Sequence, residues 1–184
     1  MKNQKITRLG NPLLRQKAKR LTKEEILSAE IQELIAAMKT TVASKKYGVG
    51  LAAPQVGTSI ALSVIAIKPT PNRPQLESFE AVIINPEIIE THGYRKQLWE
   101  GCISSGNGRD TLFAKVPRYK AITLRWYDEQ AVLHEEKLTG FRAHVAQHET
   151  DHLNGILFVD KVKDRATFMM QDEYIKRVVK KRAV

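Results

Sequence analysis

The sequence HETDH at residues 148–152 has the pattern H-E-x-x-H, which is the segment of this chain best suited to chemistry. On a helix, histidines four residues apart lie on one face about one turn apart, so His148 and His152 can bind one metal ion. Glu149 projects from nearly the same face and can reach a water molecule on that metal without binding the metal itself. The pattern therefore indicates a metal site that activates water.

The residues before the motif place it on the buried side of a helix. Phe141, Val145 and His148 follow one another at helical spacing and form a single stripe. Burying two imidazoles and a carboxylate there without a function would cost stability. The pattern is short enough to arise by chance on a surface helix, and His144 offers a second pair with His148. No acid stands between those two, so we favour the pair formed by His148 and His152.

Cys102 is the best candidate for a third metal ligand. Two histidines leave a tetrahedral catalytic metal one protein ligand short. No histidine follows His152, and Asp160 lies beyond the expected helix. As the sole cysteine, Cys102 excludes an intrachain disulfide, and such a thiol is commonly a small buried hydrophobe. A thiolate with two imidazoles suits Zn²⁺, Fe²⁺ or Ni²⁺, so we expect Cys102, His148 and His152 to hold one divalent metal.

Length and composition indicate one globular domain. Of the 184 residues, 42% are hydrophobic and 27% are charged, which suits a folded domain and not a disordered chain. No apolar run reaches the roughly 18–20 residues that span a membrane. Residues 1–20 also lack the apolar core of a signal peptide. We therefore expect a single domain over residues 1–184, located in the cytoplasm and without a membrane partner.

The chain is basic, because 30 Lys and Arg residues against 20 Asp and Glu residues give a net charge of +10. Such a charge attracts polyanions without sequence preference, which is compatible with contact to RNA or the ribosome. Residues 174–182, with the sequence YIKRVVKKR, concentrate positive charge near the C-terminus. We expect no sequence-specific nucleic-acid binding.

Hydrophobic periodicity predicts an α+β fold with mixed or antiparallel strands. A capping box at residues 22–25 begins an N-terminal helix, whose apolar stripe includes Leu27. A second helix is expected over residues 140–153, ended by Gly155, and a C-terminal helix over residues 166–182. Strands are expected at residues 60–67, 81–89, 121–127 and 132–138, the last two forming a hairpin.

Three segments stand in an order that is specific to one family. They are GVGLAAPQ at residues 48–55, EGCIS at 100–104 and QHETDHLNG at 147–155. Together they resemble the three motifs of the peptide deformylases, with Ile in place of Leu in the second. Residues 6–20 and the INP at 84–86 are also similar to this family. The resemblance covers about residues 6–165.

The resemblance implies a mixed α+β domain in which the H-E-x-x-H helix packs centrally against the strands. The domain core would span about residues 6–165, followed by a basic C-terminal helix over about 166–184. The family removes the formyl group from N-terminal formyl-methionine of new polypeptides, so N-formyl-methionyl peptides are the expected substrates. Its single divalent metal, most often Fe²⁺ and otherwise Zn²⁺, Ni²⁺ or Co²⁺, would be held by Cys102, His148 and His152.

The resemblance also implies roles for other residues. Glu149 would act as the general base and then the general acid. The Gln55 side-chain amide and the Ile103 backbone N–H would stabilise the oxyanion. Glu100 would orient neighbours of the metal. The residues expected to bind or border the peptide are Gly48, Val49, Gly50, Glu100, Arg109 and Val145.

The segment after the second motif departs from the family. Residues 105–110, SGNGRD, lack the usual proline and make a longer path to the next strand. This segment includes Arg109, so the difference bears on the placement of Arg109 and on which peptides the protein prefers. One alternative is therefore a divergent deformylase-like paralogue with an altered substrate or mainly a ribosome- or RNA-binding role. Another is a zincin-type endopeptidase, which the lack of a third ligand after His152 disfavours.

Overall fold

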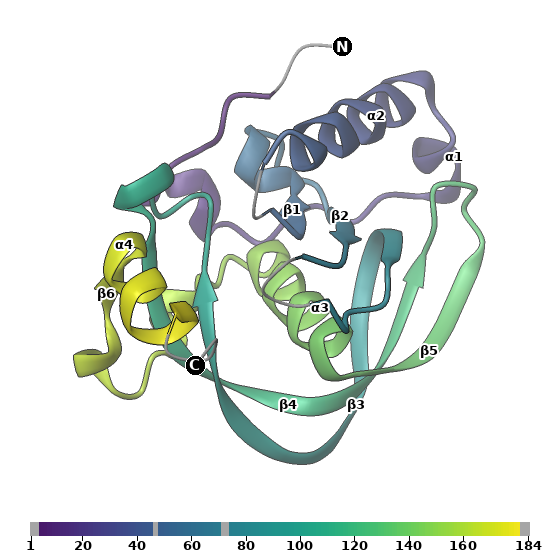
Figure 1. Ribbon diagram of the computed structural model, residues 1–184. Helices are drawn as coiled ribbons and strands as arrows, with labels where there is room; N and C mark the ends of the chain where they lie inside the picture. The colour runs from purple at the N-terminus through teal and green to yellow at the C-terminus, as the bar shows by residue number, and fades with distance from the viewer. Residues whose placement is uncertain (1–3, 46–47, 71–73, 181–184) are drawn as a thin grey trace.

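The computed structural model describes residues 4–45, 48–70 and 74–180. Figure 1 shows long curved strands surrounding one central helix, with the other helices at the periphery. The helices are α1 (Lys23–Ile26), α2 (Ala29–Ala43), α3 (Gly140–Leu153), α4 (Gln171–Tyr174) and the π-helical turn η6 (Ile175–Val179). Short 3₁₀ helices are η1 (Pro12–Arg15), η2 (Ala53–Val56), η3 (Gly108–Asp110), η4 (Phe158–Lys161) and η5 (Arg165–Thr167). The strands are β1 (Gly50–Ala52), β2 (Leu62–Ile67), β3 (Phe79–Gly101), β4 (Leu112–Tyr127), β5 (Leu133–Thr139) and β6 (Met169–Met170).

The strands form one antiparallel sheet in the order β1-β2-β3-β4-β5, and β6 pairs with β4. β3 and β4 extend well beyond the predicted strands at 81–89 and 121–127, because the two strands pair with each other as far as Gly101. Register shifts interrupt this pairing at three places, and such irregularities bend strands. The bent pair curves beneath α3 (Figure 1), which brings Cys102, the residue after β3, toward that helix.

Helix α3 has the bounds expected from the sequence, residues 140–153. Gly155 follows it with a φ of 71°, a left-handed conformation that glycine adopts without strain. The helix packs against β1, β2, β4 and β5, and Val145 shares a buried cluster with Ile122 and Leu124 of β4. The central H-E-x-x-H helix is therefore a core element.

The N-terminal helix differs from its prediction. The capping box is present, since Thr22 Oγ1 accepts from the Glu25 N–H at 3.2 Å and Glu25 Oε2 accepts from the Thr22 N–H at 2.8 Å. It opens only the single turn of α1, because Ser28 then caps a new helix through the Ile31 N–H. Leu27 lies at the break and is 58% exposed, so its assignment to the apolar stripe was wrong.

The predicted helix over residues 166–182 is also shorter in the structure. Met169 and Met170 pair with β4 as strand β6, so α4 begins only at Gln171. Helical structure then continues through η6 to Val179, and residues 181–184 lie outside the described residues. Among the residues that the structure describes, no helix is long and apolar enough to cross a membrane.

Candidate active site

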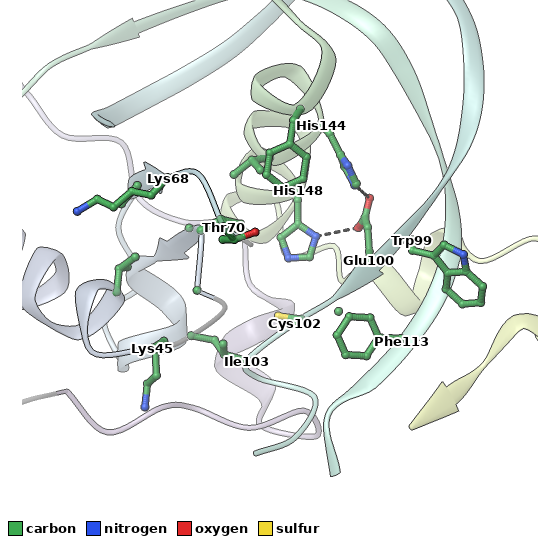
Figure 2. Close-up of a pocket in the computed structure, with 18 of the residues that line it drawn as sticks. Lys45, Lys68, Thr70, Trp99, Glu100, Cys102, Ile103, Phe113, His144 and His148 are labelled. Atoms are coloured by element: carbon green, nitrogen blue, oxygen red, sulfur yellow. Dashed lines mark hydrogen bonds and ion pairs between the residues drawn. The ribbon is translucent and has the colours of Figure 1, made fainter. Parts of the chain in front are cut away.

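Three side chains from two distant segments meet beside α3. Cys102 Sγ lies 3.2 Å from His152 Nε2, and the donor atoms of Cys102, His148 and His152 all lie within 4.8 Å of one another. Figure 2 shows His148 projecting from α3 toward the cavity that Cys102 lines. The structure thus brings together the three predicted ligands, while His144 stands outside this cluster. A thiol and two imidazoles at these separations suit one divalent cation.

Glu100 orients the cluster through hydrogen bonds. Its Oε2 accepts from His148 Nδ1 at 2.8 Å and its Oε1 lies 2.8 Å from His144 Nε2 (Figure 2), while Arg118 donates to both oxygens. Burial opposes the charge on Glu100, but His144, His148 and Arg118 hold the pKa of this carboxyl well below 4.5. The bond to Nδ1 leaves His148 Nε2 for a metal. Protein donors bond to both oxygens of Glu100, so this carboxylate is placed to orient His148 and His144.

The electrostatic surroundings of Cys102 favour its thiolate form. Burial opposes ionisation, yet the imidazoles of His152 and His148 hold the pKa of the thiol well below its ordinary value of 9.0. Gln55 Nε2 adds a hydrogen bond to Sγ at 3.2 Å. The thiolate is the form of cysteine that binds metals, so these surroundings favour binding of a cation at Cys102.

Glu149 lies beside the cluster as a buried carboxyl with an unused oxygen. It is 4% exposed, and its Oε2 has no hydrogen-bond partner among the described residues. Burial raises the pKa of Glu149 to about 7, against the attraction of His148 and His152. Gly50 of β1 leaves the room that this side chain needs, because a Cβ at residue 50 would lie 2.2 Å from Glu149 Oε1. A carboxyl in this state can exchange protons near neutral pH.

Two hydrogen-bond donors flank Cys102. Gln55 is held by its Oε1, which accepts from the Ala52 N–H at 2.8 Å, so that Nε2 points to Cys102 Sγ and to Ser104 Oγ at 3.1 Å. The Ile103 N–H makes no hydrogen bond within the part of the chain that the structure describes. Both predicted oxyanion donors therefore lie next to the proposed metal ligand.

A cavity of about 510 Å³ opens onto this cluster. Of the residues expected to bind peptide, residues 48–50, Glu100 and Val145 line it. Arg109 does not, because the turn of η3 leaves it exposed, and Phe113 lines the cavity instead. The expectation that Arg109 contacts the peptide is therefore not supported by its position.

Sequence reasoning missed the buried ion pairs behind the cluster. Arg118, 2% exposed, bridges Glu100 and Asp151, and Lys161 Nζ lies 2.8 Å from the other oxygen of Asp151. It also missed Ser104, which holds the Gln55 amide. An arginine at a buried position of an alternating strand was the available signal for Arg118, since a buried charge needs a partner.

Comparisons with known proteins place the chain in a family. The family described as polypeptide deformylase matches residues 3–168. The chain belongs to the peptide deformylases. Peptide deformylase 2 of Nostoc sp. is 40% identical over 176 residues, which cover 95% of this chain and 94% of that protein. The peptide deformylase of Leptospira biflexa is 38% identical over 168 residues, with 89% and 90% covered.

Solved deformylase structures share the fold. A Met-Ala-Ser-bound crystal structure of the class I type b enzyme from Acinetobacter baumannii has a TM-score of 0.80 at 31% identity, covering 88% of this chain and 99% of that chain. The enzyme of Synechococcus elongatus in complex with actinonin has a TM-score of 0.76 at 34% identity, covering 95% and 85%. The expected family, hydrolase class and antiparallel α+β fold are confirmed. The alternative of a mainly RNA-binding protein gains no support.

Deformylases are metalloenzymes, and the donor set of this chain fits a metal. Cys102, His148 and His152 supply one soft and two borderline donors within 4.8 Å of one another. Within the described parts of the chain this cluster offers three protein donors, and three protein ligands with one open position are typical of catalytic rather than structural tetrahedral sites.

Proposed function

We propose that this deformylase removes the formyl group from N-terminal formyl-methionine of new polypeptides, with one divalent cation held by Cys102, His148 and His152. The observation that carries this proposal is the buried Glu149 carboxyl beside those three donors, whose Oε2 has no hydrogen-bond partner among the residues that the structure describes. Fe²⁺ is the first candidate cation, and Zn²⁺, Ni²⁺ and Co²⁺ suit the same donor set. A cation bound there supplies Lewis acidity, which polarises a carbonyl and lowers the pKa of water.

Glu149 moves the proton in this scheme. Its carboxylate accepts the proton that the attacking water loses and passes it to the amine when the formamide C–N bond breaks, which releases formate and a free N-terminus. The raised pKa, about 7, matches a group that must both take and return a proton. The Gln55 amide and the Ile103 N–H donate to the carbonyl oxygen as it gains charge. Gln55 must then exchange or share one of its bonds to Ser104 and Cys102.

The edge of β1 is suited to hold the peptide backbone. Among the described residues, β1 is the terminal strand of the sheet and pairs with β2 alone, so its other edge can pair with an extended peptide. Because Gly50 has no side chain, the backbone of β1 can lie next to the Glu149 carboxyl. A Met-Ala-Ser peptide is bound in the Acinetobacter baumannii relative, which supports a peptide ligand of this type for the present chain.

Formate release tests the proposal directly. Protein loaded anaerobically with Fe²⁺ is given formyl-Met-Ala-Ser or unformylated Met-Ala-Ser, beside the same protein stripped by a chelator. We expect formate from the formylated peptide with the loaded protein alone. Cleavage of the peptide bonds of Met-Ala-Ser would instead support an endopeptidase, and no formate from protein holding one metal per chain would overturn the proposal.

We further propose one cytoplasmic domain over residues 1–184, with the ribosome as a partner through the basic C-terminal segment. Lys176, Arg177 and Lys180 are exposed on that segment. Replacing these three residues with alanine should lower the affinity for ribosomes and flatten its dependence on salt, since each lost cation removes one phosphate contact. Affinity that is unchanged between about 50 and 200 mM salt would contradict this role.

A further inference from the structure

The C-terminal segment forms one side of the catalytic cavity. Tyr174, Ile175 and Val179 line the same cavity as Cys102 and His148. They reach it because β6 pairs with β4 and so brings α4 and η6 beside the end of β3, as Figure 1 shows in yellow. The family match ends at residue 168, so Tyr174, Ile175 and Val179 lie outside the matched residues.

Three aromatic rings build this side, which we call the aromatic wall (Trp99, Phe113 and Tyr174). Tyr174 stacks on Phe113 with ring centroids 4.2 Å apart and planes 6° apart, and it meets Trp99 at 5.5 Å and 60°. Phe113 lies against Gly101, where a Cβ would come within 2.6 Å of the ring. Because Gly101 precedes Cys102, the Phe113 ring of the wall packs against the residue next to a proposed metal ligand, and Figure 2 shows Phe113 near Cys102.

The segment formed by α4 and η6 has an apolar side toward the cavity and a charged side toward solvent. Tyr174, Ile175 and Val179 are half-buried and face the cavity, whereas Lys176 and Arg177 are exposed. The Lys180 N–H donates to the Ile175 carbonyl and closes the π-helical turn of η6. Apolar contact with the cavity is thus combined with a basic outer surface.

We propose that the aromatic wall binds an apolar side chain at the residue after formyl-methionine and makes the enzyme favour peptides with a large apolar residue there. This proposal rests on the proposed function. The cavity of about 510 Å³ is large enough for more than one residue, since sites for drug-sized ligands measure about 300–1,000 Å³. Trp99, Phe113 and Tyr174 line the same cavity as Cys102 and His148, so their faces can stack on or pack against that second side chain.

Kinetics on two formylated peptides test the wall. We expect the kcat/KM of formyl-Met-Phe-Ala to exceed that of formyl-Met-Ala-Ala by about fivefold, within the range that one aromatic contact gives. Tyr174→Ala should bring this ratio close to one, mainly through KM, and Tyr174→Phe should restore it. Tyr94→Ala, at an exposed tyrosine outside the cavity lining, should leave both activities and their ratio unchanged. If Tyr174 only packs the C-terminal segment, both peptides lose activity by the same factor, which would overturn the proposal.

Binding without turnover separates failure of the wall from failure of the proposed reaction. The chain has two tryptophans, Trp99 in the wall and Trp126, which is 4% exposed in the core beneath α3. In the Zn²⁺-loaded Glu149→Ala variant, formyl-Met-Phe-Ala should change the fluorescence at lower concentration than formyl-Met-Ala-Ala does. The change should disappear with Trp99→Phe. If the wild type releases no formate but the two peptides still differ in the concentration that changes the fluorescence, the proposed reaction is wrong and the proposed role of the aromatic wall is retained. If both peptides change the fluorescence at the same concentration, the proposed role of the wall is wrong.

Discussion

Replacing Arg118 with methionine should destabilise the protein strongly. The Arg118 guanidinium donates to both oxygens of Glu100, at 2.6 and 3.0 Å, and to Asp151. The side chains of Arg118 and Glu100 are 2% and 3% exposed, so the variant leaves buried carboxylates without their main cation. Breaking a buried pair in this way costs about 3–5 kcal/mol. For a chain of this length that corresponds to a fall of about 6–20 °C in Tm.

Arg125→Met supplies a matched control on the same strand. Arg125 pairs with Glu135 at 2.8 Å, but the two side chains are 44% and 48% exposed, and exposed pairs contribute about 0–1 kcal/mol. Both variants are unfolded thermally and in urea at pH 7 after chelation, because a bound cation would add to stability. A Tm for Arg118→Met within about 2 °C of the Tm for Arg125→Met would contradict the claim that the buried ion pairs of Arg118 stabilise the fold around the site.

Three further changes have distinct expected outcomes. Cys102→Ser should lower the metal content measured by elemental analysis below that of the wild type, and equal content would remove Cys102 from the ligand set. Gly50→Ala places a Cβ 2.2 Å from Glu149 Oε1 and should lower formate release by about 100-fold, which near-normal turnover would contradict. Asp128→Asn should lower the free energy of unfolding by about 1 kcal/mol at pH 7. Burial opposes the charge on Asp128, but His134 and two backbone N–H groups outweigh burial and hold the pKa of this carboxyl below 3.8. That difference in unfolding free energy should persist above pH 3.8 and vanish as the pH falls through the folded pKa; a difference independent of pH would contradict it.

The central helix could be predicted from the sequence because its signals are local. Helical spacing and the glycine at residue 155 determine where α3 begins and ends, and both are read directly from neighbouring residues. β3 could not be bounded in the same way, since its second half, residues 92–99, is mostly polar and exposed. Pairing with β4, and not its own pattern, keeps that half extended. Likewise, Leu27 fits a helical stripe, but the Ser28 cap interrupts it.

The candidate site was predictable where chemistry alone selects the residue. A metal with two histidines needs a third donor, and Cys102 was the only soft one, although it lies 50 residues from His152. Arg118 and Asp151 are 33 residues apart, and no spacing rule links them. The aromatic wall depends on β6 joining β4, so the position of Tyr174 could not be inferred from helical periodicity at the C-terminus.

The most direct test compares formate release by the wild type and by Glu149→Ala at equal metal content. Both proteins are loaded anaerobically with Fe²⁺, their metal is counted, and formate from formyl-Met-Ala-Ser is measured under the same conditions. We expect one metal per chain in both proteins and turnover about 10²–10⁴-fold lower in the variant, the usual contribution of a positioned general base. Equal turnover at equal metal content would contradict the role of Glu149.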